Sequence, residues 1–475
     1  MFSLPDEVEY ELQKQYGEPF QVNRKNEIKG INEQYFAGFF AETTTTIYSP
    51  TKKSFYLYGY ETGVWKPESD EKIINMIGQS LLWYSREYNA PALLSFRKHS
   101  TYTAISKLLK GLVENIDAFT KSHSFYYHCA DCMLVIDRIT GEVTSQIFSP
   151  EYFSLYQSTI NYNPDFKCPK FIELLLSNAM TPDDIEHLQR YFGQCLLGVN
   201  ISQTFLLLIG TPGGGKSTLV NLIEKIVGRW LCAELRTAHA TGRFETGSFK
   251  GKTLLTGKDV DSNYMNGAGA RVLKFLTGND TMTGEYKNSN TRHDIEGNFN
   301  IIITSNNTQR INFDGDIDAW RRRILVIRYE NPPPEKKIAN FDDLLLEEEG
   351  PGILNWAMEG AVKLIQNGGI ISKSAEQQAR VDMLLKSSQP FKVFADNFIH
   401  PTSGAAITTE EVVSTFMKFC NKQGWGVPAE RKIQQQLREY MAKEYGACCS
   451  HGIKRHGKSK RGYHGYQIRI SKGAS

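Results

Sequence analysis

The chain has 475 residues, of which 40% are hydrophobic and 23% charged, and its mean hydropathy of -0.39 is ordinary for a globular protein. At about 150 residues per domain, this length predicts roughly three domains with substantial cores. The net charge of +3 selects no class of partner. No apolar run approaches the ~18 residues of a membrane span, and the N-terminus lacks a secretory signal, so we expect a cytoplasmic protein with no membrane partner.

The eight cysteines are interpreted as reduced thiols, because their spacing over this length does not suggest a disulfide framework. Four residues, His123, His128, Cys129 and Cys132, could in principle hold zinc. However, a Cys-x-x-Cys pair without a second such pair is a weak signal, and the overlapping CMLVIDRITGEV predicts a strand that runs into a turn. We therefore expect core or surface thiols rather than a structural zinc site.

The first 200 residues predict a mixture of strands and helices. Residues 32–67 are rich in aromatic side chains with a strand-like alternation, and residues 70–125 carry helical periodicity. A helix is expected to begin at Thr181, where an N-cap threonine is followed by a proline and two acidic residues. Gly198 is its expected end.

From Thr204 onward, short apolar strands alternate with helices, which predicts an α/β domain with a buried central sheet. The expected strands are TFLLLIG, KTLLTG, NFNIIITSN and RILVIRY. Three prolines at 332–334 follow, and LLLEEEGPGILNWAMEGAVKLIQNGG predicts a helical lid. After Pro390, two amphipathic helices, a basic glycine-rich turn and a last strand resemble a winged helix, a common DNA-binding shape.

The chain from Ser450 to Ser475 carries seven basic residues and no acidic residue. Such a run is either a solvated tail or a surface that binds phosphate backbones, and composition alone favours neither. Within a winged-helix-like unit, the second interpretation predicts that basic side chains bind duplex DNA. The candidates are Lys454, Arg455, Lys458, Lys460 and Arg461.

The strongest chemical motif is Gly-x-x-x-x-Gly-Lys-Ser, from Gly210 to Ser217. Its glycines let successive backbone N–H groups turn towards phosphates, Lys216 supplies a positive charge, and the Ser217 hydroxyl can ligate Mg²⁺. An apolar strand precedes the motif and a helix follows it, which is the context of a P-loop. The motif therefore predicts a nucleoside triphosphate site. Its expected residues are Gly210, Thr211, Pro212, Gly213, Gly214, Gly215, Lys216, Ser217 and Thr218.

Two further strands end in polar residues suited to nucleotide hydrolysis. Asp259 follows KTLLTG and could hold Mg²⁺ and polarise an attacking water, while Asp261 remains an alternative for that role. A surface carboxylate after a strand is the simpler interpretation of either residue. Asn306 ends IIITS, and its amide could orient a water near the γ-phosphate.

Three arginines, Arg321, Arg322 and Arg323, follow Trp320 and precede another apolar strand. Adjacent arginines repel one another on the surface of a monomer. Facing the γ-phosphate of a neighbouring subunit, they would instead stabilise transition-state charge. A solvated basic cluster is the alternative.

These motifs, in this order, resemble those of the superfamily 3 helicases and, among them, the phage, plasmid and poxvirus primase-helicase family. The order is the P-loop, Asp259, a motif from Lys274 to Lys287, Asn306, and the segment Trp320–Arg322. Upstream, ITGEVTSQIFSPEYFSLYQSTINYNPDFKCPKFIELL resembles the accessory region of that family. The resemblance covers roughly residues 32–470.

The resemblance implies an AAA+-like core that binds ATP and Mg²⁺ and forms a homo-hexameric ring around one DNA strand. It implies that Lys274 and Lys287 contact this strand, and that Arg321 and Arg322 act on the ATP of a neighbouring subunit. A separate primase or polymerase is a further expected partner, in the cytoplasm of a host cell. The implied parts are a segment of unassigned role (1–31), an accessory domain (32–200), the ATPase core (201–335), a helical lid (336–390) and a winged-helix-like DNA-binding domain (391–475).

Two features differ from the family pattern. The family usually has glutamate where this chain has Asp259, so a shorter side chain stands at the position of the proposed base. Many relatives carry a fused primase-polymerase domain, yet residues 1–200 contain no apolar strand with an Asp-x-Asp metal pair. We interpret the chain as the motor without the primase.

We therefore expect an ATP-dependent DNA helicase that acts in the replication of a phage, plasmid or other mobile element. The alternative is an origin-binding initiator or loader that uses ATP only as a switch. Unwinding of a fork without an origin sequence distinguishes the two. A small-molecule P-loop kinase accounts for neither the arginine run nor the basic C-terminal unit.

Overall fold

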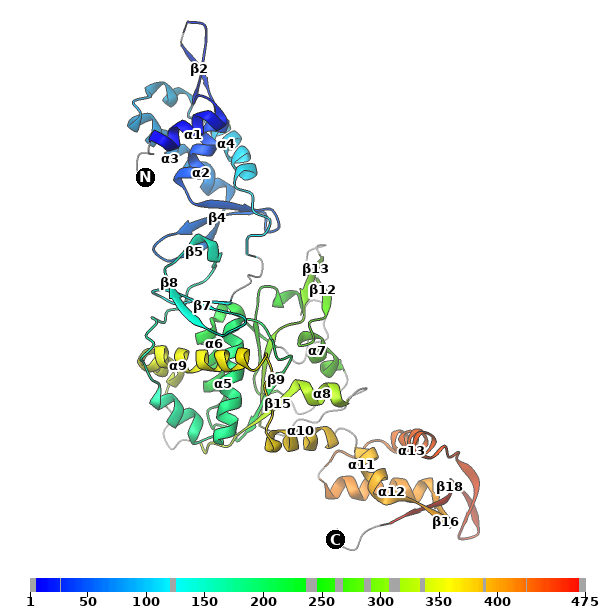
Figure 1. Ribbon diagram of the computed structural model, residues 1–475. Helices are drawn as coiled ribbons and strands as arrows, with labels where there is room; N and C mark the ends of the chain where they lie inside the picture. Colours follow the sequence, from blue (N-terminus) through cyan, green and yellow to red (C-terminus); the bar gives the residue numbers. More distant parts are fainter. Residues whose placement is uncertain are drawn as a thin grey trace. The chain divides into compact units, whose positions relative to one another are not determined.

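The structure is a computed structural model that describes residues 6–25, 27–119, 125–235, 246–260, 268–285, 292–306, 317–333, 338–387, 390–423 and 425–469. The chain divides into two compact units, residues 1–165 and 166–475, each described here by itself (Figure 1). His123, Asp261 and Lys287 lie outside the described residues. Within the described ranges, no helix is both long and apolar enough to cross a membrane.

The first unit combines α-helices with small antiparallel sheets, which pair as β1-β2, β3-β4-β5 and β6-β7-β8. Its helices are α1 (Asp6–Tyr16), α2 (Glu33–Thr43), α3 (Asp70–Glu87) and α4 (His99–Leu112), with 3-10 turns at Pro91–Phe96 and Pro150–Tyr152. Its strands are β1 (Phe20–Val22), β2 (Ile28–Ile31), β3 (Thr46–Ser49), β4 (Ser54–Gly59), β5 (Val64–Glu68), β6 (Phe125–His128), β7 (Met133–Ile136) and β8 (Val143–Gln146).

The helix α2 corrects the strand-like interpretation of residues 32–67 over its first part. Asn32 caps this helix, because its side chain accepts hydrogen bonds from the backbone N–H groups of Gln34 and Tyr35. The aromatic residues that suggested a strand recur on one face of the helix and are buried. They are Tyr35, Phe36, Phe39 and Phe40. From Thr46 onward the strand pattern is confirmed, in β3, β4 and β5.

The second unit is built on a five-stranded parallel sheet in the order β10-β11-β14-β9-β15. The strands are β9 (Phe205–Gly210), β10 (Cys232–Glu234), β11 (Leu254–Gly257), β14 (Asn300–Ser305) and β15 (Ile324–Tyr329), with a separate hairpin of β12 (Thr281–Glu285) and β13 (Arg292–Glu296). The helices are a π-helix (Phe171–Ser177), α5 (Pro182–Leu197), α6 (Lys216–Val227), α7 (Ala268–Leu276), α8 (Ile317–Arg323), α9 (Phe341–Gln366) and α10 (Ala375–Ser387), with 3-10 turns at Arg229–Leu231 and Thr246–Phe249.

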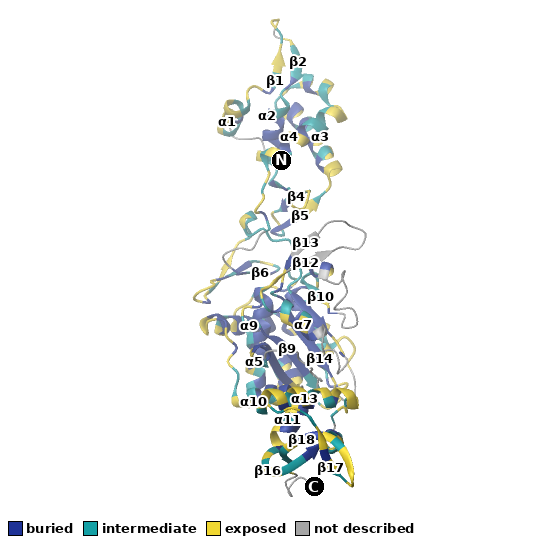
Figure 2. Ribbon diagram, turned by 90° about the vertical axis from the view of Figure 1, so that its right-hand side faces the viewer, coloured by how far each residue is buried: buried dark blue, intermediate teal, exposed yellow. Residues whose placement is uncertain are grey.

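Helices cover both faces of this sheet, so its strands are apolar along nearly their whole length. Figure 1 shows α5, α6 and α9 on one face, and the core of the other face includes Leu273 of α7, Trp320 of α8 and Val381 of α10. Figure 2 shows β9 and β14 in the colour of buried residues. The four predicted strands are confirmed as β9, β11, β14 and β15, whereas β10 was not predicted.

The helix α5 belongs to this unit, and its predicted limits are confirmed. The Thr181 hydroxyl accepts a hydrogen bond from the Asp184 N–H (3.3 Å), and Gly198 ends the helix in the left-handed conformation. The buried Tyr191 hydroxyl donates to the carbonyl of Ile301 in β14 (2.7 Å). The helix α5 packs on α9 and lies in the second of the two compact units, which begins at residue 166.

The C-terminal part of the second unit has its own core, made by helices on an antiparallel sheet in the order β16-β18-β17. A capping box between Thr408 and Glu411 begins α12, and its apolar face includes Val412 and Phe416. The elements are α11 (Pro390–Phe398), β16 (Ile399–Thr408), α12 (Thr409–Lys422), α13 (Glu430–Tyr445), β17 (Ser450–Arg455) and β18 (Lys458–Ile468).

Candidate active site

Three of the four predicted groups of catalytic residues follow three neighbouring strands of the parallel sheet. The P-loop follows β9, Asn306 follows β14, and Asp259 lies two residues after β11. Because the order is β11-β14-β9 and the strands are parallel, their carboxyl ends meet at one edge. We call this the carboxyl edge of the sheet; ligands of open α/β sheets bind at such edges.

The P-loop needs its glycines for turns and for close packing. Gly213 and Gly215 have φ of +76° and +106°, values that favour glycine. A Cβ on Gly210 would lie 1.7 Å from the carbonyl oxygen of Tyr329, so β15 packs directly against the loop. Asn331, just beyond β15, donates from its side chain to the Gly214 carbonyl (3.1 Å). Contacts with β15 and Asn331 therefore hold the loop in place, in addition to the turns formed by its own glycines.

The Lys216 side chain joins two of the motifs. It is only 4% exposed, and its ammonium donates to the carbonyls of Gly210 (2.9 Å) and Thr211 (2.7 Å) and to Oδ1 of Asn306 (2.9 Å). Burial lowers the pKa of Lys216, and the charge of Asp259 partly opposes this shift. The lysine of the loop and the amide at the end of β14 thus lie in direct contact.

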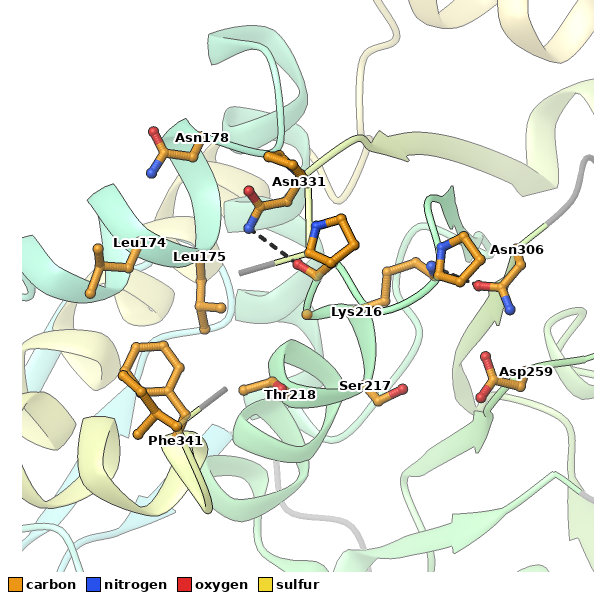
Figure 3. A pocket seen from close by; sticks show the side chains of 17 residues that line it. Leu174, Leu175, Asn178, Lys216, Ser217, Thr218, Asp259, Asn306, Asn331 and Phe341 are labelled. Atoms are coloured by element: carbon orange, nitrogen blue, oxygen red, sulfur yellow. Dashed lines mark hydrogen bonds between the residues drawn. The ribbon is translucent and has the colours of Figure 1, made fainter. Parts of the chain in front are cut away.

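Asp259 occupies an unusual backbone position. Its φ of +51° lies in the left-handed region, which aspartate tolerates better than most residues. Its backbone N–H donates to the Thr304 hydroxyl (3.0 Å), and the Val260 N–H donates to the Thr304 carbonyl (3.0 Å). The carboxylate is thereby turned to the carboxyl edge, where it lines the same cavity as Ser217 (Figure 3). A hydroxyl and a carboxylate are oxygen donors that suit Mg²⁺.

A cavity of about 710 Å³ contains these residues, a volume typical of ligand sites. Figure 3 shows that it extends away from Asp259 and Asn306, across the P-loop, to side chains that our reading of the sequence did not identify. These are Leu174, Leu175, Asn178, Asn331, Pro332, Pro333, Ile338 and Phe341. They come from the π-helix, from the chain after β15 and from the beginning of α9, and no local motif marks them.

The three arginines lie at the opposite edge of the sheet. They end α8 and directly precede β15, which runs parallel to β9. Arg321 is paired with Asp382 (2.8 Å) and with Asp318, and Arg323 is buried. Arg322 is exposed, and its guanidinium has no hydrogen bond or ion pair within the described part of the chain. Arg321 and Arg322 are the two arginines expected to act on the ATP of a neighbouring subunit, and among the described residues Arg322 is the one without an acidic partner.

Lys373, in the connection between α9 and α10, fixes the end of α8. Its ammonium donates to the carbonyl of Arg322 (3.1 Å) and to that of Arg321, so it satisfies carbonyls that a helix end leaves free. The pKa of Lys373 is lowered to about 8, chiefly by burial; the charge of Asp382 partly opposes this shift and that of Arg321 adds to it. These groups line a second, basic cavity with Gln203 and Ser372.

Comparison with known proteins matches two regions of the chain to family models. Residues 35–178 match the family model described as "D5 N terminal like", and residues 208–323 match the one described as "Family of unknown function (DUF5906)". The second match spans the P-loop, Asp259, Asn306 and the arginines in the expected order. The chain therefore contains a D5 N-terminal-like region followed by a region of the kind associated with superfamily 3 helicases.

Matches to individual proteins are more limited than the matches to the family models. The "Uncharacterized mitochondrial protein ymf21" of Marchantia polymorpha is 34% identical over 122 residues, which are 22% of this chain and 63% of that protein. The chain therefore spans less than two thirds of this relative. Two apo structures of the "NrS-1 C terminal region" align over 91% of this chain and 98–100% of theirs, with 12% and 13% identity and TM-scores of 0.47 and 0.49. Scores at this level do not establish a shared fold.

The basic residues expected to contact DNA differ in whether an acidic side chain pairs with them. Lys274 is exposed on α7. In the β17–β18 hairpin, Arg455 is paired with Glu411 (2.8 Å) and Lys460 with Glu410 (2.6 Å), which corrects the view of this run as unopposed. The hairpin charges that remain without an acidic partner in the described structure are Lys454, Lys458 and Arg461.

The cysteine cluster of the first unit gives only three close ligand atoms. Among the described residues, one atom each from Cys129, Asp131 and Cys132 lie within 4.8 Å of one another. The His128 ring is turned elsewhere, since its Nδ1 pairs with the Ser154 hydroxyl (2.7 Å). Burial raises the pKa of both thiols, which favours the neutral form over a metal-binding thiolate. The preference for core thiols over zinc stays a prediction.

Proposed function

We propose that this protein is an ATP-dependent DNA helicase that hydrolyses ATP between the subunits of a homo-hexameric ring. The proposal is supported by the matches of residues 35–178 and 208–323 to the two family models and by one observation, the separation of the arginines from the P-loop of the same chain. Both groups are needed for hydrolysis in the proposed mechanism. They lie at opposite edges of one sheet.

The strand pairing sets the size of this separation. Ile324 pairs with Phe205 at the first end of the strands, and Tyr329 pairs with Gly210 at the other. Six residues of strand at about 3.3 Å each span roughly 20 Å. Arg322 precedes this span and Gly210 ends it, so Arg322 is too far to reach a γ-phosphate at its own Lys216. A second subunit brings a P-loop and an arginine together.

At the carboxyl edge, each residue has a proposed role. In the structure, the Lys216 ammonium is held by two loop carbonyls and Asn306; with nucleotide present, it would turn to the β/γ-phosphate oxygens. Asn306 would then be free to orient the attacking water, and Asp259 would accept its proton. Ser217 and Asp259 would hold Mg²⁺, which supplies charge neutralisation for the phosphates when bound. The backbone N–H groups of the loop and of the first turn of α6 complete the phosphate site.

We assign DNA contacts to two further regions. By resemblance to the family, we propose that Lys274 and Lys287 contact the single strand in the ring channel. In the C-terminal part, α11, α12, α13 and the β17–β18 hairpin have the helix and strand order of a winged helix, and we propose that this part binds duplex DNA. The outward face of α13 adds Arg431, Gln435 and Arg438, side chains suited to phosphates and base edges.

The test is strand displacement on a fork that carries no origin sequence. We expect the full-length protein to unwind it in the presence of ATP and Mg²⁺, while the Lys216→Ala variant binds the fork without unwinding it. An origin-binding initiator predicts ATP-dependent melting confined to its own site and no displacement on this substrate. Absence of displacement by a wild-type protein that hydrolyses ATP would reject the helicase and leave the initiator.

A further inference from the structure

The cavity at the P-loop is larger than its phosphate-binding part. Beyond Thr218, away from Asp259, it is lined by Leu174 and Leu175 of the π-helix and by Phe341 at the start of α9 (Figure 3). Ile338 also lines the cavity. Leu174 is 41% exposed and Ile338 is 56% exposed, which is unusual for large apolar side chains that line one hollow. A flat apolar ligand next to the phosphate site would cover them.

One polar side chain lies among these apolar ones. Asn178 directly follows the π-helix, is exposed, and lines the cavity; its amide makes no hydrogen bond within the described residues. An amide offers a donor and an acceptor side by side, the pattern that pairs with the edge of adenine. Irregular helical turns of the π type are frequent at functional sites.

The wall that carries Asn178 is fixed relative to the P-loop. The Ala179 carbonyl, one residue on, accepts from the Glu330 N–H (2.9 Å), and the next residue, Asn331, binds Gly214 of the loop. Two hydrogen bonds between neighbouring segments therefore connect the chain next to Asn178 with the phosphate-binding backbone. This connection fixes the distance between Asn178 and the phosphate-binding loop.

The start of the π-helix is fastened to α9. The buried carboxylate of Glu349 accepts hydrogen bonds from the backbone N–H groups of Lys170 (2.9 Å) and Phe171 (2.8 Å). At the start of α9, Asp342 pairs with Lys225 of α6 (2.6 Å), and both side chains are largely buried. These contacts between the π-helix, α9 and α6 thus fix the positions of Leu174, Phe341 and the phosphate site relative to one another.

We propose that the purine base of the nucleotide lies between Leu174 and Phe341, and that the Asn178 amide reads the edge of an adenine. The amide oxygen accepts from the exocyclic amino group, and the amide N–H donates to the neighbouring ring nitrogen. Asn178 is then a specificity-determining residue, and the segment that ends the D5 N-terminal-like region supplies it. We rest this inference on the nucleotide hydrolysis of the proposed function.

The experiment compares Asn178→Asp with Ser177→Asp in the full-length protein. A carboxylate only accepts hydrogen bonds, so it opposes the ring nitrogen of adenine and pairs with the two donors of guanine. We expect wild type to bind ATP more tightly than GTP, and Asn178→Asp to shift the ratio of dissociation constants towards GTP by on the order of tenfold or more. The Ser177→Asp control adds the same charge one residue away, on a side chain outside the nucleotide cavity. It should keep the wild-type ratio.

Equilibrium binding of ATP, GTP and inorganic tripolyphosphate separates the outcomes. Tripolyphosphate affinity should be equal in Asn178→Ala and wild type, whereas ATP affinity should fall in the variant. An ATP-to-GTP ratio unchanged in Asn178→Asp, or an equal loss for tripolyphosphate, would overturn the assignment. Because binding needs neither DNA nor unwinding, a protein that fails the fork assay can still pass this test, and the two failures are distinguishable.

Discussion

The two edges of the five-stranded sheet differ in how far their charged side chains are buried and paired within the chain. At the carboxyl edge, Lys216 is buried and in contact with Asn306, and Asp259 lies nearby with Ser217. At the other edge, Arg322 has its charge exposed, although Lys373 and Asp382 hold the helix that carries it. One edge has a cavity lined by most of the groups that hydrolysis needs, whereas the other has an exposed arginine without an acidic partner among the described residues.

This difference indicates how the chain divides a reaction between two molecules. A positive charge held at a fixed helix end costs conformational freedom and electrostatic energy, and no acid of the described chain compensates it at Arg322. A neighbouring subunit's γ-phosphate would compensate it. The following predictions test whether the two edges form halves of one site.

The largest effect is expected at the carboxyl edge. Lys216→Ala should remove measurable ATP hydrolysis, because no other described side chain of the loop brings a cation to the phosphates. Asp259→Asn should retain nucleotide binding while turnover falls by about 10²- to 10⁴-fold, the range for loss of a general base. Steady-state ATPase and equilibrium ATP binding check both. Wild-type turnover in Asp259→Asn would remove the residue from its proposed role and make Asp261 the candidate.

A slightly smaller effect is expected at the arginine edge. Arg322→Ala should lower kcat by about 10³-fold or more, with ATP affinity unchanged, since its own nucleotide cavity is at the other edge. Arg321 is engaged by Asp318 and Asp382, so Arg321→Ala should lower kcat less. Asp382→Asn serves as the matched control for the loss of that pairing. A larger loss for Arg321→Ala than for Arg322→Ala would exchange the two assignments.

A moderate effect is expected in the β17–β18 hairpin. Lys454→Ala and Lys458→Ala should each reduce the slope of log K against log salt for duplex binding by about 0.9, one phosphate contact apiece. Arg455→Ala and Lys460→Ala should change the slope less, because both side chains are already paired with acids. Fluorescence anisotropy with a short duplex measures the slopes, and basal ATPase should be unaffected. Equal slopes for all four variants and wild type would favour the interpretation of this basic run as a solvated tail that does not bind DNA.

The smallest effect concerns pH and Lys373. Its folded-state pKa is about 8, below the ordinary value of 10.5, so the unfolded chain binds more protons between these values. Stability therefore includes a contribution that rises with pH across about 8 to 10.5. Denaturant unfolding at pH 7.5 and 9.5 should show a smaller rise in the midpoint for Lys373→Met than for wild type. An identical pH dependence of the two proteins would show that Lys373 does not titrate in this window.

The sequence predicted the parts of the site that are local in the chain. The P-loop, the strands before Asp259 and Asn306, and the limits of α5 each carry their signal within a few residues. Asn306 was assigned to water orientation from its place after an apolar strand, and its contact with Lys216 brings it into the same cavity. These residues were accessible because glycine spacing, strand length and capping depend on neighbouring positions.

The parts that were missed depend on distant segments. Asn178 and Phe341 lie on either side of the P-loop in sequence and meet it only through the folded sheet and α9. The aromatic side chains of α2 were interpreted as strand-like because the cap at Asn32 carries the deciding signal, and burial on one helical face was not visible. Counting charges after Ser450 could not show that Glu410 and Glu411 of α12 neutralise Lys460 and Arg455.

The most direct test of the two-edge account is a mixing experiment with two inactive variants. Lys216→Ala lacks a working carboxyl edge and Arg322→Ala lacks the exposed arginine, so each should be inactive alone. In a mixed ring, some junctions join an intact P-loop to an intact arginine, and ATPase measured with single-stranded DNA should peak at intermediate ratios. If subunits are shown to exchange and activity stays at zero across all ratios, the arginine and the P-loop do not form one site between subunits.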